Sequence, residues 1–109
     1  MGTYTFWNLF KSKKKIRFEK TKELMNYAQE KGAFATGLSK KDMKDFIDKL
    51  IVITNEYGYG VNGEGEIITS LPKFIERRIS NTSSRVQYFW MDVLDYYEIY
   101  YNKNKNQKS

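Results

Sequence analysis

An aromatic stripe near the C-terminus constrains the fold of this chain more than any other feature of its sequence. Between residues 85 and 101, apolar side chains recur at the three- and four-residue spacing of an α-helix. The stripe consists of Val86, Phe89, Trp90, Val93, Leu94, Tyr97, Tyr100 and Tyr101. Aromatic side chains bury large apolar areas, so a helix with this face needs a cover. We therefore predict a long C-terminal helix whose apolar face is buried.

Two kinds of cover are open for this helix. It closes the protein's own core, or part of its tyrosine-rich surface meets a second copy of the chain. Tyr and Trp are favoured at interfaces because they give large contact areas at low entropic cost. The residues expected in such a homodimer interface are Tyr88, Trp90, Tyr96, Tyr97 and Tyr100.

Capping residues and apolar spacing predict three more helices upstream. The first covers residues 21–31, with Thr21 as its N-cap. The second covers residues 40–57, where Ser39 and an acidic residue three positions later resemble a capping box. The third starts at a Leu-Pro pair ending in Pro72, a position where the first turn of a helix tolerates proline.

Two segments are typical of β structure. Residues 15–18 alternate charged and apolar side chains, which predicts a short, half-buried strand. The Asn62-Gly63 pair stands between two β-prone segments and predicts a hairpin, because both turn positions favour positive φ. Helices and hairpin together give an α+β fold. The length allows one core, so we expect a single domain over residues 1–101 and a basic, solvated tail over residues 102–109.

The residue types present exclude most catalytic and metal chemistry. The sequence contains neither Cys nor His, so the common nucleophile pairs and zinc sites cannot form. Its glycine-rich segment lacks the Gly-Lys-Ser/Thr of a phosphate-binding loop. We expect a protein that is not an enzyme and has no metal or cofactor. No apolar run approaches the roughly 20 residues of a membrane span, and no secretion signal is evident, so we expect a cytoplasmic protein without membrane partners.

Positive charge is concentrated in one short segment. Residues 11–22 carry seven basic side chains against one acidic, whereas residues 23–101 carry nine basic against twelve acidic. Such a segment attracts phosphates, with an affinity that falls steeply as salt is added. Its candidate DNA-binding residues are Lys13, Lys14, Lys15, Arg17, Lys20 and Lys22. Two alternatives are a solvated, solubilising face, and a polybasic patch at a membrane surface beside the aromatic residues at positions 6, 7 and 10.

The order of elements resembles a winged helix-turn-helix domain. Two local matches carry the resemblance: a strand at residues 16–18 before the helix at 21–31, and the run Asn55-Glu56-Tyr57-Gly58-Tyr59 before a glycine-rich hairpin. In size, composition and element order, the chain is similar to the TcpK-like winged-helix proteins that mark the transfer origin of conjugative plasmids.

This resemblance implies a DNA-binding accessory protein of a plasmid or other mobile element. It would bind double-stranded DNA as a homodimer and help a relaxase to assemble. The helix at residues 40–57 would be the recognition helix, and Asn62 and Gly63 would form the wing tip. The helix residues facing the DNA would be Ser39, Lys40, Lys41 and Lys44.

A protein-interaction module is the alternative function. The aromatic C-terminal helix and the acidic hairpin would then bind another protein, as in a phage-encoded inhibitor or an assembly factor. If the protein captured a partner protein equally well at all salt concentrations and did not bind duplex DNA, the protein-interaction function would be favoured over the DNA-binding one.

Overall fold

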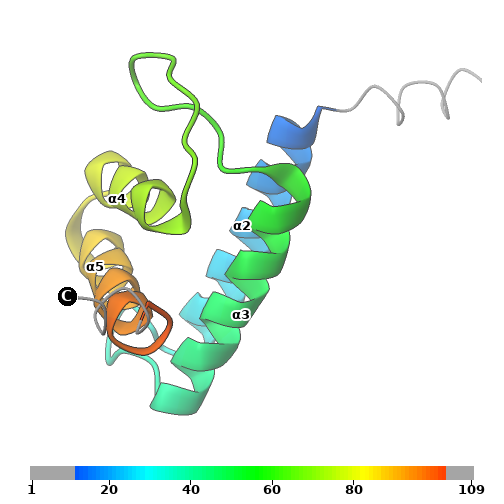
Figure 1. The fold of residues 1–109 in the computed structure, drawn as a ribbon. Helices are drawn as coiled ribbons and strands as arrows, with labels where there is room; N and C mark the ends of the chain where they lie inside the picture. Colours follow the sequence, from blue (N-terminus) through cyan, green and yellow to red (C-terminus); the bar gives the residue numbers. More distant parts are fainter. Residues whose placement is uncertain (1–11, 103–109) are drawn as a thin grey trace, which may run out of the picture.

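The computed structural model describes residues 12–102, which fold into two pairs of helices. The first pair is α2 (Lys13–Glu30) and α3 (Lys40–Tyr57), and the second is α4 (Leu71–Asn81) and α5 (Ser84–Tyr100). Helices pack most closely within each pair, and α5 also meets α3. Figure 1 shows α2 and α3 side by side and antiparallel, with the second pair beside them and the loop between α3 and α4 projecting past α4.

The expected α+β fold is wrong, because residues 12–102 contain no strand. The expected wing is a loop closed by one antiparallel bridge between Val61 and Ile67. Its turn also differs from the expected one: among its glycines, positive φ falls on Gly65 (+84°) and not on Gly63. Val61 and Ile67 are 39% and 77% exposed, so the alternating side chains have no core to cover. A lone two-stranded ribbon without such a core is marginal in water.

The expected strand at residues 15–18 is also wrong, since these residues lie within α2. The helix begins at Lys13, where the hydroxyl of Ser12 accepts a hydrogen bond from the backbone N–H of Lys15 at 3.1 Å. Thr21 is consequently not a cap; it is buried, 5% exposed, on the inner face of the helix. A four-residue alternation is too short to outweigh a cap followed by a face that packs on α3.

The remaining helix predictions are confirmed. Helix α3 spans residues 40–57 as expected, and Ser39 Oγ accepts from the N–H of Asp42 at 3.1 Å. Helix α4 starts at the Leu-Pro pair, and α5 covers nearly the whole of the aromatic stripe. Of the predicted tail at 102–109, residues 103–109 lie outside the described part of the chain.

Trp90 stands at the centre of the core and joins the two pairs. Its indole meets the ring of Phe46 from α3 edge-on, with centroids 5.8 Å apart, and the ring of Phe74 from α4 at 6.4 Å. The largest fully buried side chains are Trp90, Phe46, Ile47, Leu50, Ile75 and Val93. Every helix of the described region except α2 contributes to this set, and α2 adds Leu24 and Ala28 to the same core.

No helix in residues 12–102 is long and apolar enough to cross a membrane.

Replacing Trp90 with Ala tests the role of this side chain in joining the pairs. We expect a loss of about 3–5 kcal/mol in the free energy of unfolding, because the large side chain leaves a cavity that the packed rings cannot fill. Tyr88→Ala on the same helix is the control, since Tyr88 is 67% exposed and should change stability by no more than about 0.5 kcal/mol. Urea unfolding of both variants measures this, and equal losses would contradict the packing described.

Candidate functional site

A cleft of about 500 Å³ lies between α2 and the second helix pair. Its basic lining comes from two distant parts of the sequence: Lys14, Arg17 and Lys22 on α2, and Arg77 and Arg78 on α4. None of the described residues that line it is acidic. We call this feature the basic cleft. Three of the chain's four arginines face it, and Arg85 is the exception.

Arg17 fixes one wall of the basic cleft. Its Nη1 donates a hydrogen bond to the backbone oxygen of Tyr57 at 3.0 Å, which ties α2 to the end of α3. A Cβ on Gly60, where φ is +91°, would lie 2.7 Å from Nη2 of Arg17. Gly60 therefore lets the loop after α3 approach the guanidinium closely. Burial lowers the pKa of Arg17, and the charge of Arg77 lowers it further, although the group keeps its proton.

Arg78 lies opposite, on α4, with its guanidinium 5.9 Å from the ring centroid of Phe74. Burial lowers its pKa, and repulsion from Arg77 and then from Arg17 adds to this effect. Its buried Nε has no hydrogen-bond partner, and neither does the buried hydroxyl of Thr21 across the cleft. Buried polar atoms are nearly always paired, so these two unpaired atoms stand out. Clustered positive charge and free hydrogen-bonding atoms suit an anion.

Four aromatic side chains also line the cleft, together with Thr21, Met25, Thr82 and Val86. Phe18 on α2 is 62% exposed, whereas Trp90 is 1% exposed and closes the floor. Tyr59 and Phe74 complete the set. The basic cleft thus offers cations and flat apolar surfaces within the same space.

The basic residues expected on α2 divide into two groups. Lys14, Arg17 and Lys22 line the basic cleft. Lys13, Lys15 and Lys20 are exposed on the same helix but are not part of the lining.

The residues expected to read DNA from α3 lie elsewhere. Ser39 is engaged in capping its own helix. Lys40, Lys41 and Lys44 are exposed at the start of α3, whereas Arg17 contacts its end. Because α3 has 18 residues, the two places are roughly 25 Å apart along the helix. The structure does not bring these lysines to the basic cleft.

Tyrosines at and just after the end of α5 also cover the first half of α3. The hydroxyl of Tyr101 donates to Asp48 Oδ1 at 2.9 Å and lies 3.2 Å from the backbone oxygen of Lys44. The ammonium of Lys44 pairs with Asp48 at 2.9 Å. The hydroxyl of Tyr96 lies 3.4 Å from the backbone oxygen of Lys40. One lysine is neutralised locally, and this end of α3 is fixed by the C-terminal helix.

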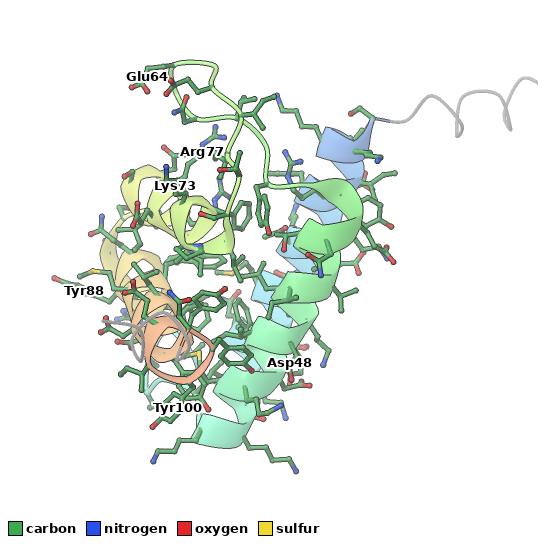
Figure 2. All side chains as sticks on the ribbon, viewed as in Figure 1. Asp48, Glu64, Lys73, Arg77, Tyr88 and Tyr100 are labelled. Atoms are coloured by element: carbon green, nitrogen blue, oxygen red, sulfur yellow. The ribbon has the colours of Figure 1, made fainter. Side chains whose placement is uncertain are left out.

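Asn62 serves the loop that it belongs to. Its Oδ1 accepts from the N–H groups of Glu64 and Glu66, both at 2.9 Å, and its Nδ2 donates to the carboxylate of Glu66 at 3.0 Å. Gly63 is exposed and is followed by the acidic Glu64. Figure 2 shows Glu64 at the outer end of this loop, above Lys73 and Arg77 of α4.

The expected interface residues fall into three groups. Trp90 belongs to the protein's own core and is not available to a second copy. Tyr96 and Tyr97 are half-buried against that core. Tyr88 and Tyr100 are 67% and 46% exposed, and both point outward from α5 (Figure 2).

Sequence reasoning missed the Arg77-Arg78 pair and the exposed ring of Phe18. The available signal for the arginines was their spacing from Phe74, since residues three and four positions after a buried aromatic lie next to it on a helix. That spacing places them beside the core, but only tertiary contact places them opposite α2.

Comparisons with known proteins give no assignment: no family model, no curated protein and no solved structure matches this chain. Within residues 12–102, no three or more acidic side chains gather as a metal site would require.

Replacing Arg77 with Gln tests the repulsion in the basic cleft. For the wild type, we expect the free energy of unfolding to rise by a few tenths of a kcal/mol as salt is added, because salt screens the facing guanidinium groups. The rise should be smaller in Arg77→Gln. Arg85→Gln is the control, since it removes the same charge outside the cleft and should retain the wild-type salt response. Identical responses in both variants would show that the arginines do not repel one another.

Replacing Tyr101 with Phe tests the cover over α3. Hydrogen bonds from Lys44 and then from Tyr101 hold the pKa of Asp48 below its usual value. Because the folded pKa is lowered, Asp48 stabilises the fold above the ordinary aspartate pKa of about 3.9, and this contribution is lost as the pH falls through the lowered value. Tyr101→Phe should raise the pKa of Asp48, measured by NMR titration of the carboxyl carbon. The pKa of Asp45, which bonds Lys49 and Tyr27, should stay unchanged.

Proposed function

We propose that this protein binds double-stranded DNA by holding its phosphates at the basic cleft and along the exposed face of α2. The observation that carries the proposal is the convergence of basic residues from α2 and α4 around one cleft with no acidic residue in its described lining. The distribution of charge along the sequence supports it, since residues 23–101 as a whole are slightly acidic. The positive charge is therefore local.

Phosphate attraction explains this distribution of charge better than solubility does. A solubilising face needs no concave shape, and paired surface lysines serve it equally well. On α3, Lys44 and Lys49 are paired with acidic residues one turn away, at 2.9 and 2.6 Å. At the cleft, by contrast, arginines face one another at a cost to their own charged states. Phosphates of a bound polyanion would relieve the repulsion between the arginines. Release of the counterions condensed on that polyanion would further favour binding.

Contacts of this kind position a protein on DNA without reading sequence. The side chain of Asn62, which we expected at a wing tip, is occupied within its own loop. The transfer-origin and relaxase roles rested on the winged-helix resemblance, so they stay predictions and do not form part of this proposal.

A second candidate function is binding of another protein or of a second copy through α5. Tyr88, Met91 and Ile99 are 67%, 44% and 57% exposed, and their spacing places them on one face of the helix. Scattered exposed apolar residues are normal, and the exposed Asp95, four residues from both Met91 and Ile99, interrupts this row, so the surface it offers is mixed. Of the residues expected at a homodimer interface, Tyr88 is the one that belongs to this row.

Duplex binding by two variants with equal charge loss tests the proposal. The cleft variant carries Lys14→Gln, Lys22→Gln and Arg77→Gln, and the α3 variant carries Lys40→Gln, Lys41→Gln and Lys44→Gln. We expect the cleft variant to lose affinity by about tenfold or more at low salt, and the slope of log affinity against log salt to fall by roughly one for each phosphate contact removed. The α3 variant should change much less. Fluorescence anisotropy with a labelled duplex measures both.

A larger loss of duplex affinity in the α3 variant would indicate that the start of α3 binds the DNA, and it would contradict the proposal. Absence of duplex binding by the wild type at low salt would overturn it entirely.

A further inference from the structure

We infer that the basic cleft accepts an unpaired nucleotide of a DNA strand, with the base stacked on Phe18 and the adjoining phosphate held by Arg77 and Arg78. This inference rests on the proposed function and deepens it: the cations that hold duplex phosphates would also hold the phosphate of an unpaired nucleotide, whose base enters the cleft. The exposed face of α2 would contact the flanking phosphates.

The position of Phe18 is the first observation. A phenyl ring that is 62% exposed is unexpected in the most basic segment of the chain. Lys14 and Lys22 stand four residues before and after it, so all three lie on one stripe of α2, and all three line the cleft. The stripe is about 12 Å long. Proteins that bind single strands combine aromatic rings, on which bases stack, with cations that follow the backbone.

The chemistry of the interior is the second observation. The half-buried ring of Tyr59 lies beside the arginines, and the buried rings of Phe74 and Trp90 form the apolar floor, within a volume of about 500 Å³. That volume falls within the range of roughly 300–1,000 Å³ that holds small ligands. A paired base inside a duplex exposes only its edges, because its faces are covered by its neighbours. Aromatic surface at the bottom of a cleft is therefore useful to an unpaired base and not to a stacked one.

Two unpaired polar atoms are the third observation. The hydroxyl of Thr21, a residue that is 5% exposed, lies one turn from Phe18 and has no hydrogen-bond partner. The Nε of Arg78 is likewise buried without a partner. Both residues line the cleft. A nucleotide that displaces the side chains covering them would bring base-edge groups and phosphate oxygens to these atoms, whereas an apolar ligand would leave them unsatisfied.

Variants of Phe18 and Thr21 test the inference, with a labelled oligo-dT strand of about 12 nucleotides, a length within the site size of small modules. We expect Phe18→Ala to weaken binding of this strand by about tenfold or more, and Phe18→Tyr to retain it, because stacking on one base contributes that much. Duplex affinity should change by less than about threefold in both, since the duplex contacts cations only. Circular dichroism should show an unaltered fold, as Phe18 is largely exposed.

Thr21→Val separates a ligand contact from a structural role. Removing an unpaired buried hydroxyl should maintain or raise the free energy of unfolding, yet weaken binding of the oligo-dT strand. Free dTMP shares the same chemistry but lacks the flanking phosphates, so it should compete only in large excess.

The outcomes distinguish this inference from the proposed function. Equal losses for strand and duplex in Phe18→Ala, or no loss for the strand, would overturn the unpaired-nucleotide site while DNA binding stands. If dTMP bound as tightly as the oligo-dT strand, the ligand of the cleft would be a free nucleotide, and the proposal that it belongs to a strand would be wrong. If neither strand nor duplex binds the wild type, both the inference and the proposed function are wrong.

Discussion

The packing of Trp90 between the two helix pairs determines both the fold and the shape of the cleft. Its ring meets Phe46 of α3 on one side and Phe74 of α4 on another, so the same contact holds both pairs in place. Trp90 also lines the floor of the basic cleft, and Phe74 forms part of its side. The distance between α2 and α4, and with it the spacing of their cations, therefore follows from how these rings pack.

The surrounding structure holds Arg17 and Arg78 in place despite the repulsion among Arg17, Arg77 and Arg78. The carbonyl of Tyr57 holds the guanidinium of Arg17, and Gly60 gives it room. Arg78 lies against Phe74 and next to the core. Preorganised cations of this kind bind an anion without first losing side-chain freedom, which favours affinity. Lys44 near the start of α3 shows the opposite arrangement, since it pairs with Asp48, which also accepts a hydrogen bond from Tyr101.

Features that depend on neighbouring residues in the sequence could be predicted, and features that depend on tertiary contact could not. The bounds of α3 followed from a serine cap, helical spacing and a terminal glycine, which are all local signals. The alternation at residues 15–18 misled because such a short pattern fits a helix face as well as a strand. The hairpin failed because the side chains of Val61 and Ile67 meet no core. The basic segment of α2 was visible in the sequence, but its partners on α4 follow it by more than fifty residues and meet it only in the folded chain.

Side-chain NMR of the four arginines during a DNA titration tests the central claim, that the cleft between α2 and α4 holds DNA phosphates, most directly. The account predicts that the Nε–H signals of Arg77 and Arg78 shift as DNA is added, while that of Arg85, outside the cleft, stays in place. Equal shifts at Arg85, or binding that leaves Arg77 and Arg78 unchanged, would contradict it.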